Sequence, residues 1–226
     1  MEKQSQTKGI IRSLGLVFGD IGTSPIYTVT VVFLLLKPTH DNVIGVLSLI
    51  VWTLLTLVTV QYAWLAMSLS RRGEGGTIVL KEILTSLLPS RRNTGAVMII
   101  SIVGVSLLIG DGVITPAISI LSAVEGSLLI PGLGGLSKTT LVIIAAIIAI
   151  ILFVFQSKGT EKVAGAFGPI MALWFASLAF IGIVFIFETP EVLKALNPYW
   201  GLEFLSENGI SGFIALGEII LCATGG

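Results

Sequence analysis

Long apolar runs alternate with short polar clusters along the whole chain. A helix needs about 20 residues to cross the hydrocarbon core of a bilayer, and six runs reach or approach that length. They cover approximately residues 12–36, 43–69, 97–129, 139–156, 163–187 and 212 to the end. The third run would be about 48 Å long as a straight helix, so it must tilt, kink or project beyond the bilayer. The pattern predicts an all-α polytopic membrane protein with five spans and an unfinished sixth.

The amino-acid composition supports a membrane protein. Of the 226 residues, 54% are hydrophobic and 12% are charged, whereas soluble domains carry about 25% charged residues. The mean hydropathy is +1.00, and the charged residues fall mostly between the apolar runs. These values exclude an ordinary soluble domain.

Lysine and arginine indicate which side of the membrane each loop faces, because cytoplasmic loops carry the excess. With the N-terminus inside, ten of the 13 basic residues fall in inner segments and three in outer loops. The inner ones are Lys3, Lys8, Arg12, Arg71, Arg72, Lys81, Arg91, Arg92, Lys158 and Lys162, and the outer ones are Lys37, Lys138 and Lys194. We therefore expect a multi-pass protein of the cell membrane with a cytoplasmic N-terminus over residues 1–11. These polar residues lead directly into a long span, so no cleaved signal peptide is expected.

Enzyme and cofactor chemistry find no support in the sequence. The single Cys222 and the single His40 provide neither a disulfide framework nor a metal cluster. The glycines of "RRGEGGT", residues 71–77, lack the spacing of a phosphate-binding loop. We expect no enzymatic activity, no cofactor and no nucleic-acid partner, and the lipid bilayer is the expected environment.

Acidic residues inside the predicted spans are costly to place there and therefore informative. There are four of them: Asp20, Asp111, Glu125 and Glu218. Glu125, near the outer end of the third span, either reaches the interface or acts at an external gate. Glu218, in the last run, either pairs with another helix or contacts an ion. Asp20 and Asp111 are the strongest functional candidates because of the residues around them.

Asp20 and Asp111 occur in similar motifs, "GDIGTSP" and "GDGVITP". Each acid lies among glycines and is followed five residues later by a proline, Pro25 or Pro116. Proline removes a helical hydrogen bond and glycine leaves helical geometry readily, so both motifs predict an interrupted helix. Unwound backbone is tolerated at membrane depth only where it is buried in protein or lines a wet cavity. The freed carbonyl groups are therefore expected to have a use.

Hydroxyl groups accompany both acids. Four residues share one helix face at spacings i, i+4, i+8 and i+11: Asp111, Thr115, Ser119 and Ser122. Tyr27, seven residues after Asp20, either shares its face or belongs to the aromatic belt. Single Ser and Thr residues in membrane helices commonly serve packing, but a run of them beside a buried acid does not fit that role alone. Carboxylate, hydroxyl and carbonyl oxygens together suit a hard cation.

Five motifs occur in order: "GDIGTSPIYT", "GEGGT", "GDGVITPAISILSAVEG", "KGTEKVAGAFGPIM" and "ALNP". From Gly15 onward the sequence resembles the KUP/HAK/KT potassium uptake permeases. The resemblance implies the N-terminal part of a proton-coupled potassium importer. The family's fold resembles the amino acid/polyamine/organocation superfamily (LeuT-like), with two inverted five-helix repeats and broken first and sixth helices. Residues 12–226 would then be an incomplete transporter domain: the first five spans and the start of the broken sixth, without the second repeat and any cytosolic tail.

The resemblance also implies a set of residues for potassium binding and proton coupling. They are Asp20 and Tyr27 on the first span, Asp111, Thr115 and Ser119 on the third, and Thr224 in the terminal "ATGG". Potassium would lie at Asp20 and Asp111, as the transported ion, with the proton as the coupling ion. Desolvation favours the neutral carboxyl group and a nearby cation favours the charged one, which links the two ions. Which acid carries the proton stays open. A homodimer is the expected assembly of the full-length protein.

Other functions would use the same features. A potassium-selective channel would line a continuous pore with the same oxygen-rich breaks. An amino-acid transporter on the same scaffold would have to bind a carboxylate, and no Lys or Arg is buried in a span, although the N-terminus of a broken helix could serve. A structural or receptor subunit would leave two buried acids unexplained.

Glu74 in "RRGEGGT" falls in a predicted cytoplasmic loop. One role is to cap a helix predicted over "TIVLKEILTSLL", residues 77–88, that lies along the interface. The other is a part in an inner gate.

Overall fold

The chain folds almost entirely into helices in a computed structural model. The structure describes residues 10–11, 14–15, 19, 21–70, 74–89, 91–132, 134–156 and 160–223. Its elements are α2 (Ser24–Leu35), α3 (His40–Thr53), the π-helix η1 (Leu54–Ala66), α4 (Thr77–Leu87), α5 (Arg91–Gly126), η2 (Ser127–Leu129), α6 (Lys138–Gln156), α7 (Thr160–Glu188), η3 (Pro190–Leu196), α8 (Pro198–Ile220) and η4 (Leu221–Ala223). The predicted all-α class is confirmed for this part of the chain.

The long helices match the apolar runs of the sequence. Within the described ranges, four are long and apolar enough to cross a membrane: His40–Ala66, Asn93–Leu129, Phe167–Glu188 and Pro198–Ala223. Two shorter apolar helices, Ser24–Leu35 and Lys138–Val154, fall in the first and fourth predicted runs. By length and composition, these helices are consistent with a polytopic membrane protein.

The sixth helix begins earlier than predicted. Its apolar run was expected from residue 212, but α8 starts at Pro198, where the Asn197 side chain caps it by accepting a 3.0 Å hydrogen bond from the Tyr199 amide. The backbone bends at Gly209, which has φ +50° and ψ −122°. The first half of α8 carries polar side chains, so the hydrophobic pattern predicts only the half that follows the bend.

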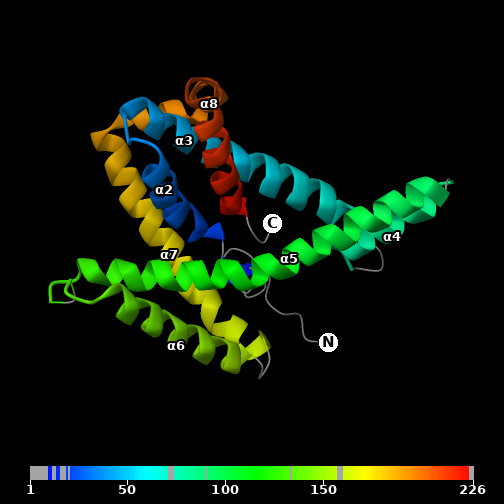
Figure 1. The fold of residues 1–226 in the computed structure, drawn as a ribbon, viewed down its shortest axis with the longest axis horizontal. Coiled ribbons are helices and arrows are strands. Elements are labelled where there is room, and N and C mark those ends of the chain that lie inside the picture. The colour runs from blue at the N-terminus through cyan, green and yellow to red at the C-terminus, as the bar shows by residue number, and fades with distance from the viewer. Residues whose placement is uncertain are drawn as a thin grey trace.

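Among the described residues, two clusters of buried side chains hold helices together. The larger one joins α2, α3, α8 and η4: Val32, Val46, Ile50, Phe204, Ala215, Ile219 and Cys222. The smaller one joins the end of α5 to α6 through Val124, Leu141 and Ala145. Figure 1 shows α6 beside the C-terminal half of α5 and α4 beside its N-terminal half.

Helix α3 lies very close to α8. A Cβ atom built on Gly45 would overlap the Phe204 side chain, so the contact requires a glycine. Next to it, the Ser48 hydroxyl donates to the Asn197 carbonyl at 2.9 Å, and the Trp52 indole N–H donates to the Leu196 carbonyl at 3.1 Å. These bonds fix η3 and the start of α8 on α3.

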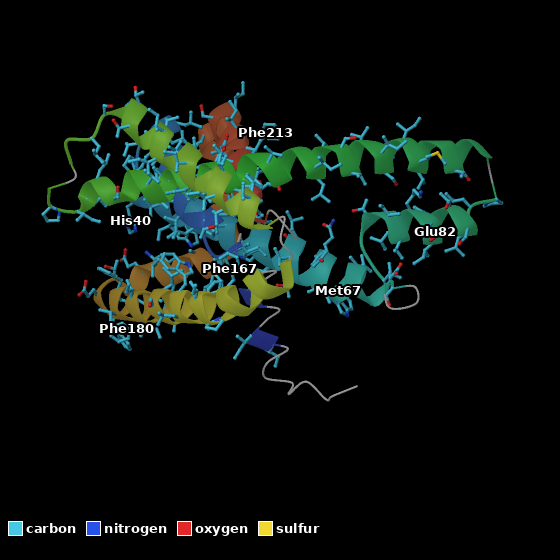
Figure 2. The ribbon with its side chains drawn as sticks, turned by 90° about the horizontal axis from the view of Figure 1, so that it is seen from below. His40, Met67, Glu82, Phe167, Phe180 and Phe213 are labelled. Carbon is cyan, nitrogen blue, oxygen red and sulfur yellow. The ribbon has the colours of Figure 1, made fainter. Side chains whose placement is uncertain are left out.

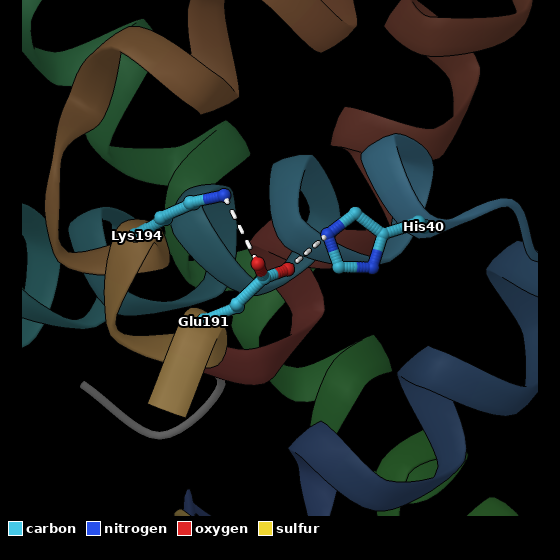
Figure 3. Close-up of polar contacts among 3 residues, drawn as sticks. All are labelled: His40, Glu191 and Lys194. Carbon is cyan, nitrogen blue, oxygen red and sulfur yellow. Dashed lines mark ion pairs between the residues drawn. The ribbon is translucent and has the colours of Figure 1, made fainter. Parts of the chain in front are cut away.

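A cluster of three ionisable side chains joins the start of α3 to η3 (Figure 3). His40 Nε2 lies 3.2 Å from Glu191 Oε2, and Lys194 Nζ lies 3.8 Å from Glu191 Oε1. All three side chains are about half exposed. Exposed pairs of this kind contribute little to stability, about 0–1 kcal/mol.

Apolar side chains cover much of the outside of the molecule (Figure 2). Phe180 is 70% exposed and Phe213 is 73% exposed. In the most apolar stretches of Asn93–Leu129 and Phe167–Glu188, none of the residues is buried. Soluble proteins rarely expose contiguous apolar surface on this scale, whereas lipid or further protein covers it in a membrane.

Candidate functional site

The first predicted run is interrupted beside its acid. Gly22 and Thr23 form a turn, and α2 starts at Ser24 with Thr23 as its N-cap and Pro25 in its first turn. Proline suits this position because the first amides of a helix have no partner within the helix. The predicted interruption in "GDIGTSP" is confirmed, while Asp20 itself lies outside the described residues.

The carbonyl group of Gly22 at this turn has a partner from a distant helix. The Trp174 indole N–H on α7 donates to it at 2.9 Å, and Gly22 is buried. The sequence predicted free carbonyls here, but Trp174 was not among the site residues. An indole N–H in the middle of a span needs an acceptor, and interrupted backbone provides one. That requirement is the signal that would have found it.

Tyr27 is buried on α2, and the residue is only 6% exposed. Its hydroxyl donates to Ser24 Oγ one turn earlier, at 3.1 Å. An aromatic-belt residue would reach the interface, so burial favours the internal position. Tyr27 and Ser24 thus present two oxygen atoms just after the turn.

The second motif does not interrupt its helix, and that prediction was wrong. α5 runs from Arg91 to Gly126 with Pro116 inside it. Pro116 has no N–H to give to the carbonyl of Gly112 four residues earlier, but the bonds on either side keep the helix intact. Long membrane helices tolerate such a loss. "GDGVITP" therefore frees one carbonyl group within a continuous helix.

Asp111 and the hydroxyls that follow it share one face of α5, as the spacing predicted. The Thr115 hydroxyl donates to Asp111 Oδ1 at 2.7 Å, and Thr115 is only 4% exposed. Ser119 Oγ, one turn further, is buried without a hydrogen-bond partner among the described residues. Asp111 and Ser122 are half-buried, whereas Gly112, Val113 and Ile114 are exposed. This face combines a carboxylate, a hydroxyl bonded to it and a hydroxyl for which the described residues offer no partner.

The remaining predicted residues lie apart from this face. Glu125 is exposed near the end of α5, and Glu218 is half-buried near the end of α8, where its backbone carbonyl accepts a 3.5 Å hydrogen bond from Thr28. Glu74 is exposed two residues before Gly76, which is the N-cap of α4 at φ +94°, so Glu74 is not itself the N-cap residue. Thr224 lies outside the described residues.

The structure thus places two groups of oxygen atoms on neighbouring helices. Tyr27 and Ser24 lie on α2, and Asp111, Thr115 and Ser119 lie on α5, which contacts α2. In the part of the chain that is described, no three His, Cys, Asp or Glu side chains cluster as they would around a transition metal. The chemistry of this region is that of hydroxyl, carboxylate and carbonyl oxygens, which suit hard cations.

Comparison with known proteins gives a consistent result. Residues 7–226 match the model of a family described as "K+ potassium transporter integral membrane domain". A protein of Methanosarcina barkeri named "Probable potassium transport system protein Kup" is 62% identical over 226 residues, which are 100% of this chain and 38% of the relative. Proteins of the same name from Geotalea uraniireducens and Trichlorobacter lovleyi are 62% and 64% identical over 223 and 218 residues, 99% and 96% of this chain and 37% and 36% of the relatives.

The chain therefore spans little more than a third of the length of these curated relatives. No solved structure matches it. The family match covers nearly the whole chain and agrees with the four apolar helices. The chain is an integral membrane protein and belongs to the K+ potassium transporter integral membrane domain family.

Proposed function

We propose that this chain is the N-terminal part of a transporter that imports potassium by proton symport. The observation that carries the proposal is the face of α5 formed by Asp111, Thr115 and Ser119. The names of the relatives, potassium transport system proteins, support the same substrate. The protein lies in the cell membrane with its N-terminus in the cytoplasm, as the excess of inner basic residues indicates.

The oxygen atoms of this face suit a desolvated potassium ion. By donating its proton to Asp111, Thr115 leaves its oxygen lone pairs free to face a cation. The buried Ser119 hydroxyl has no partner in the described part of the chain, and a buried polar group without a partner costs about 1–3 kcal/mol. A bound cation would satisfy that oxygen. Asp20 and Tyr27 on the first span and Thr224 at the sixth complete the proposed ligand set.

The carboxylates couple proton binding to potassium binding. Protonation neutralises Asp111 or Asp20 and removes the charge that holds the cation, so proton and potassium occupancy of one site are linked. Such coupling requires that both ions reach the same acid. Glu125 and Glu218 are candidates for gating or secondary sites.

The first run and α7 point in the same direction, as a LeuT-like arrangement requires. Residues Ile11 and Gly15 pack on Gly168 of α7, and Gly22 accepts a bond from Trp174 of α7. The later residue of the first run contacts the later residue of α7, so the two segments run in the same direction. The first and fifth spans must do so if the chain crosses the membrane at each run. An inverted repeat with broken first and sixth helices is the arrangement that we propose.

Uptake of rubidium, a potassium substitute, by the full-length protein tests the proposal. Cells without their own potassium uptake systems would express the wild type, Asp111→Asn and Asp20→Asn. Ser106→Ala is the control. Ser106 is exposed on the same helix, and its hydroxyl donates to the Ile102 carbonyl one turn earlier. We expect each Asn variant to fall below about a tenth of the wild-type rate, and a proton uncoupler to abolish wild-type uptake.

Three outcomes would contradict the proposal. Normal uptake by Asp111→Asn would remove that acid from the ion path. Single-channel currents that do not saturate would favour a channel. Proton-dependent uptake of an amino acid without rubidium uptake would assign a different substrate to the same scaffold.

A further inference from the structure

We propose that Trp174 is a positioning residue for the interrupted stretch that follows Asp20. Its indole N–H, on α7, donates to the carbonyl group of Gly22 at 2.9 Å, across 152 positions of sequence. Gly22 comes two residues after Asp20. The inference rests on the proposed function, because it is the ion site that this stretch would serve.

The Trp174 bond takes the place of a missing helical bond. In a continuous helix the carbonyl of Gly22 would accept from the amide of Ile26, four residues later. That amide donates to the Thr23 carbonyl instead, at 3.1 Å. The carbonyl of Gly22 is buried at membrane depth, where it needs a donor. Trp174 supplies that donor and thereby stabilises the turn in this conformation.

Helix α7 also holds the chain on the other side of Asp20. A Cβ atom on Gly15 would come within 2.8 Å of the Gly168 Cα, and one on Gly168 would overlap the Ile11 carbonyl. The two backbones thus touch through glycines. Gly168 and Trp174 are six residues apart, about 9 Å along a helix, so α7 contacts the first run both before and after its acid.

This arrangement has a consequence for ion binding. A carbonyl oxygen has two lone pairs, so Gly22 can accept the indole proton and still face a cation. Without the indole bond, the turn would lose the contact that sets its direction, and the ligands on either side of it would be less well ordered. Potassium affinity would fall, whereas helix packing, which depends on the ring and the glycines, would be kept.

Trp174→Phe separates these effects, since it keeps an aromatic ring and removes the donor. Trp52→Phe is the matched control, because it loses a similar indole bond, 3.1 Å to the Leu196 carbonyl, between other helices. Both variants are made in the full-length protein. We expect Trp174→Phe to raise the KM for rubidium about threefold to tenfold, which is the range for one lost hydrogen bond. Its maximal rate per protein in the membrane should stay within about twofold of wild type, and Trp52→Phe should leave the KM unchanged.

Hydrogen–deuterium exchange gives a readout that does not depend on the transported ion. In the purified full-length protein, Trp174→Phe should speed exchange in peptides covering residues 19–26, while Trp52→Phe should not. Unchanged KM and unchanged exchange in Trp174→Phe would overturn the inference, as would equal effects of both variants. If wild-type protein takes up no rubidium, the proposed function fails and the exchange comparison alone decides the role of Trp174.

Discussion

The Asn208 side chain on α8 donates a 3.0 Å hydrogen bond to Asn42 Oδ1 on α3. The same amide nitrogen donates to the Phe204 carbonyl one turn earlier, also at 3.0 Å. The next residue is Gly209, where α8 bends. The bend is therefore fixed to α3 by a side-chain amide.

Removal of this amide should loosen the bend. We expect Asn208→Ala to lower the free energy of unfolding by about 1 kcal/mol, because one partly buried interhelical hydrogen bond is lost. Thermal unfolding of the purified full-length protein in detergent measures it. Ser206→Ala is the control, since Ser206 is exposed and bonds only to Glu203 of its own helix. In combination with Asn42→Ala, Asn208→Ala should add little further loss; full additivity would speak against a direct bond.

The contact between α3 and α8 leaves no room for a methyl group at Gly45. In Gly45→Ala the new Cβ would meet the Phe204 side chain and lie 3.1 Å from the Trp200 carbonyl oxygen. Overpacking of this kind costs about 1–3 kcal/mol, which should appear as a lower unfolding temperature. Gly104→Ala on α5 is the control because nothing lies within 4 Å of its Cβ. An unchanged unfolding temperature in Gly45→Ala would mean that the helices lie further apart.

The hydroxyl of Thr115 should be needed for its bond to Asp111. Thr115→Val keeps the shape and removes the hydroxyl, and a hydrogen bond to a charged group contributes about 1.5–3 kcal/mol. We expect the KM for rubidium to rise at least about tenfold in Thr115→Val and to stay near wild type in Thr115→Ser. Equal kinetics of the Val and Ser variants would show that the methyl group, rather than the hydroxyl, matters at this position.

The unpartnered hydroxyl of Ser119 should affect stability and binding in opposite directions. Without bound potassium, Ser119→Ala removes a buried oxygen that has no partner in the described structure, so stability should stay the same or rise. Rubidium uptake should weaken, because the cation loses one ligand. Unfolding temperature in sodium buffer and uptake kinetics are measured on the same variant. A loss of stability with normal uptake would assign Ser119 to packing alone.

Local patterns predicted the helices and the composition of the α5 face well. Apolar runs mark membrane spans because a span needs about 20 predominantly apolar residues. Each span is helical because its backbone polar groups must be satisfied within it. The spacing of Asp111, Thr115 and Ser119 predicted a shared face, and this holds because the helix stays regular through Pro116.

The same patterns failed where the outcome depends on distant residues. "GDIGTSP" and "GDGVITP" look alike, yet only the first contains a turn. The first has Thr23 and Ser24 at the start of a new helix and receives Trp174 from a helix far along the chain. The second has Val113 and Ile114, whose apolar side chains have no such use at a turn, and its Thr115 bonds to Asp111 within the helix. The local sequence shows where a new helix can start, but it does not show that the Trp174 indole on a distant helix bonds to the turn.

The continuity of α5 gives the two motifs different mechanical properties. α5 has 36 residues, so it is about 54 Å long. A rod of that length that tilts by roughly 10° moves its far end by about 9 Å, and Asp111 and the hydroxyls beside it must move with it as one body. The turn at Gly22 and Thr23, in contrast, interrupts the first run, and α7 holds the chain on both sides of it. One group of oxygen atoms thus lies on a single long helix and the other beside a turn that α7 holds, so a tilt of α5 relative to α7 would change the distance between the two groups without deforming α5.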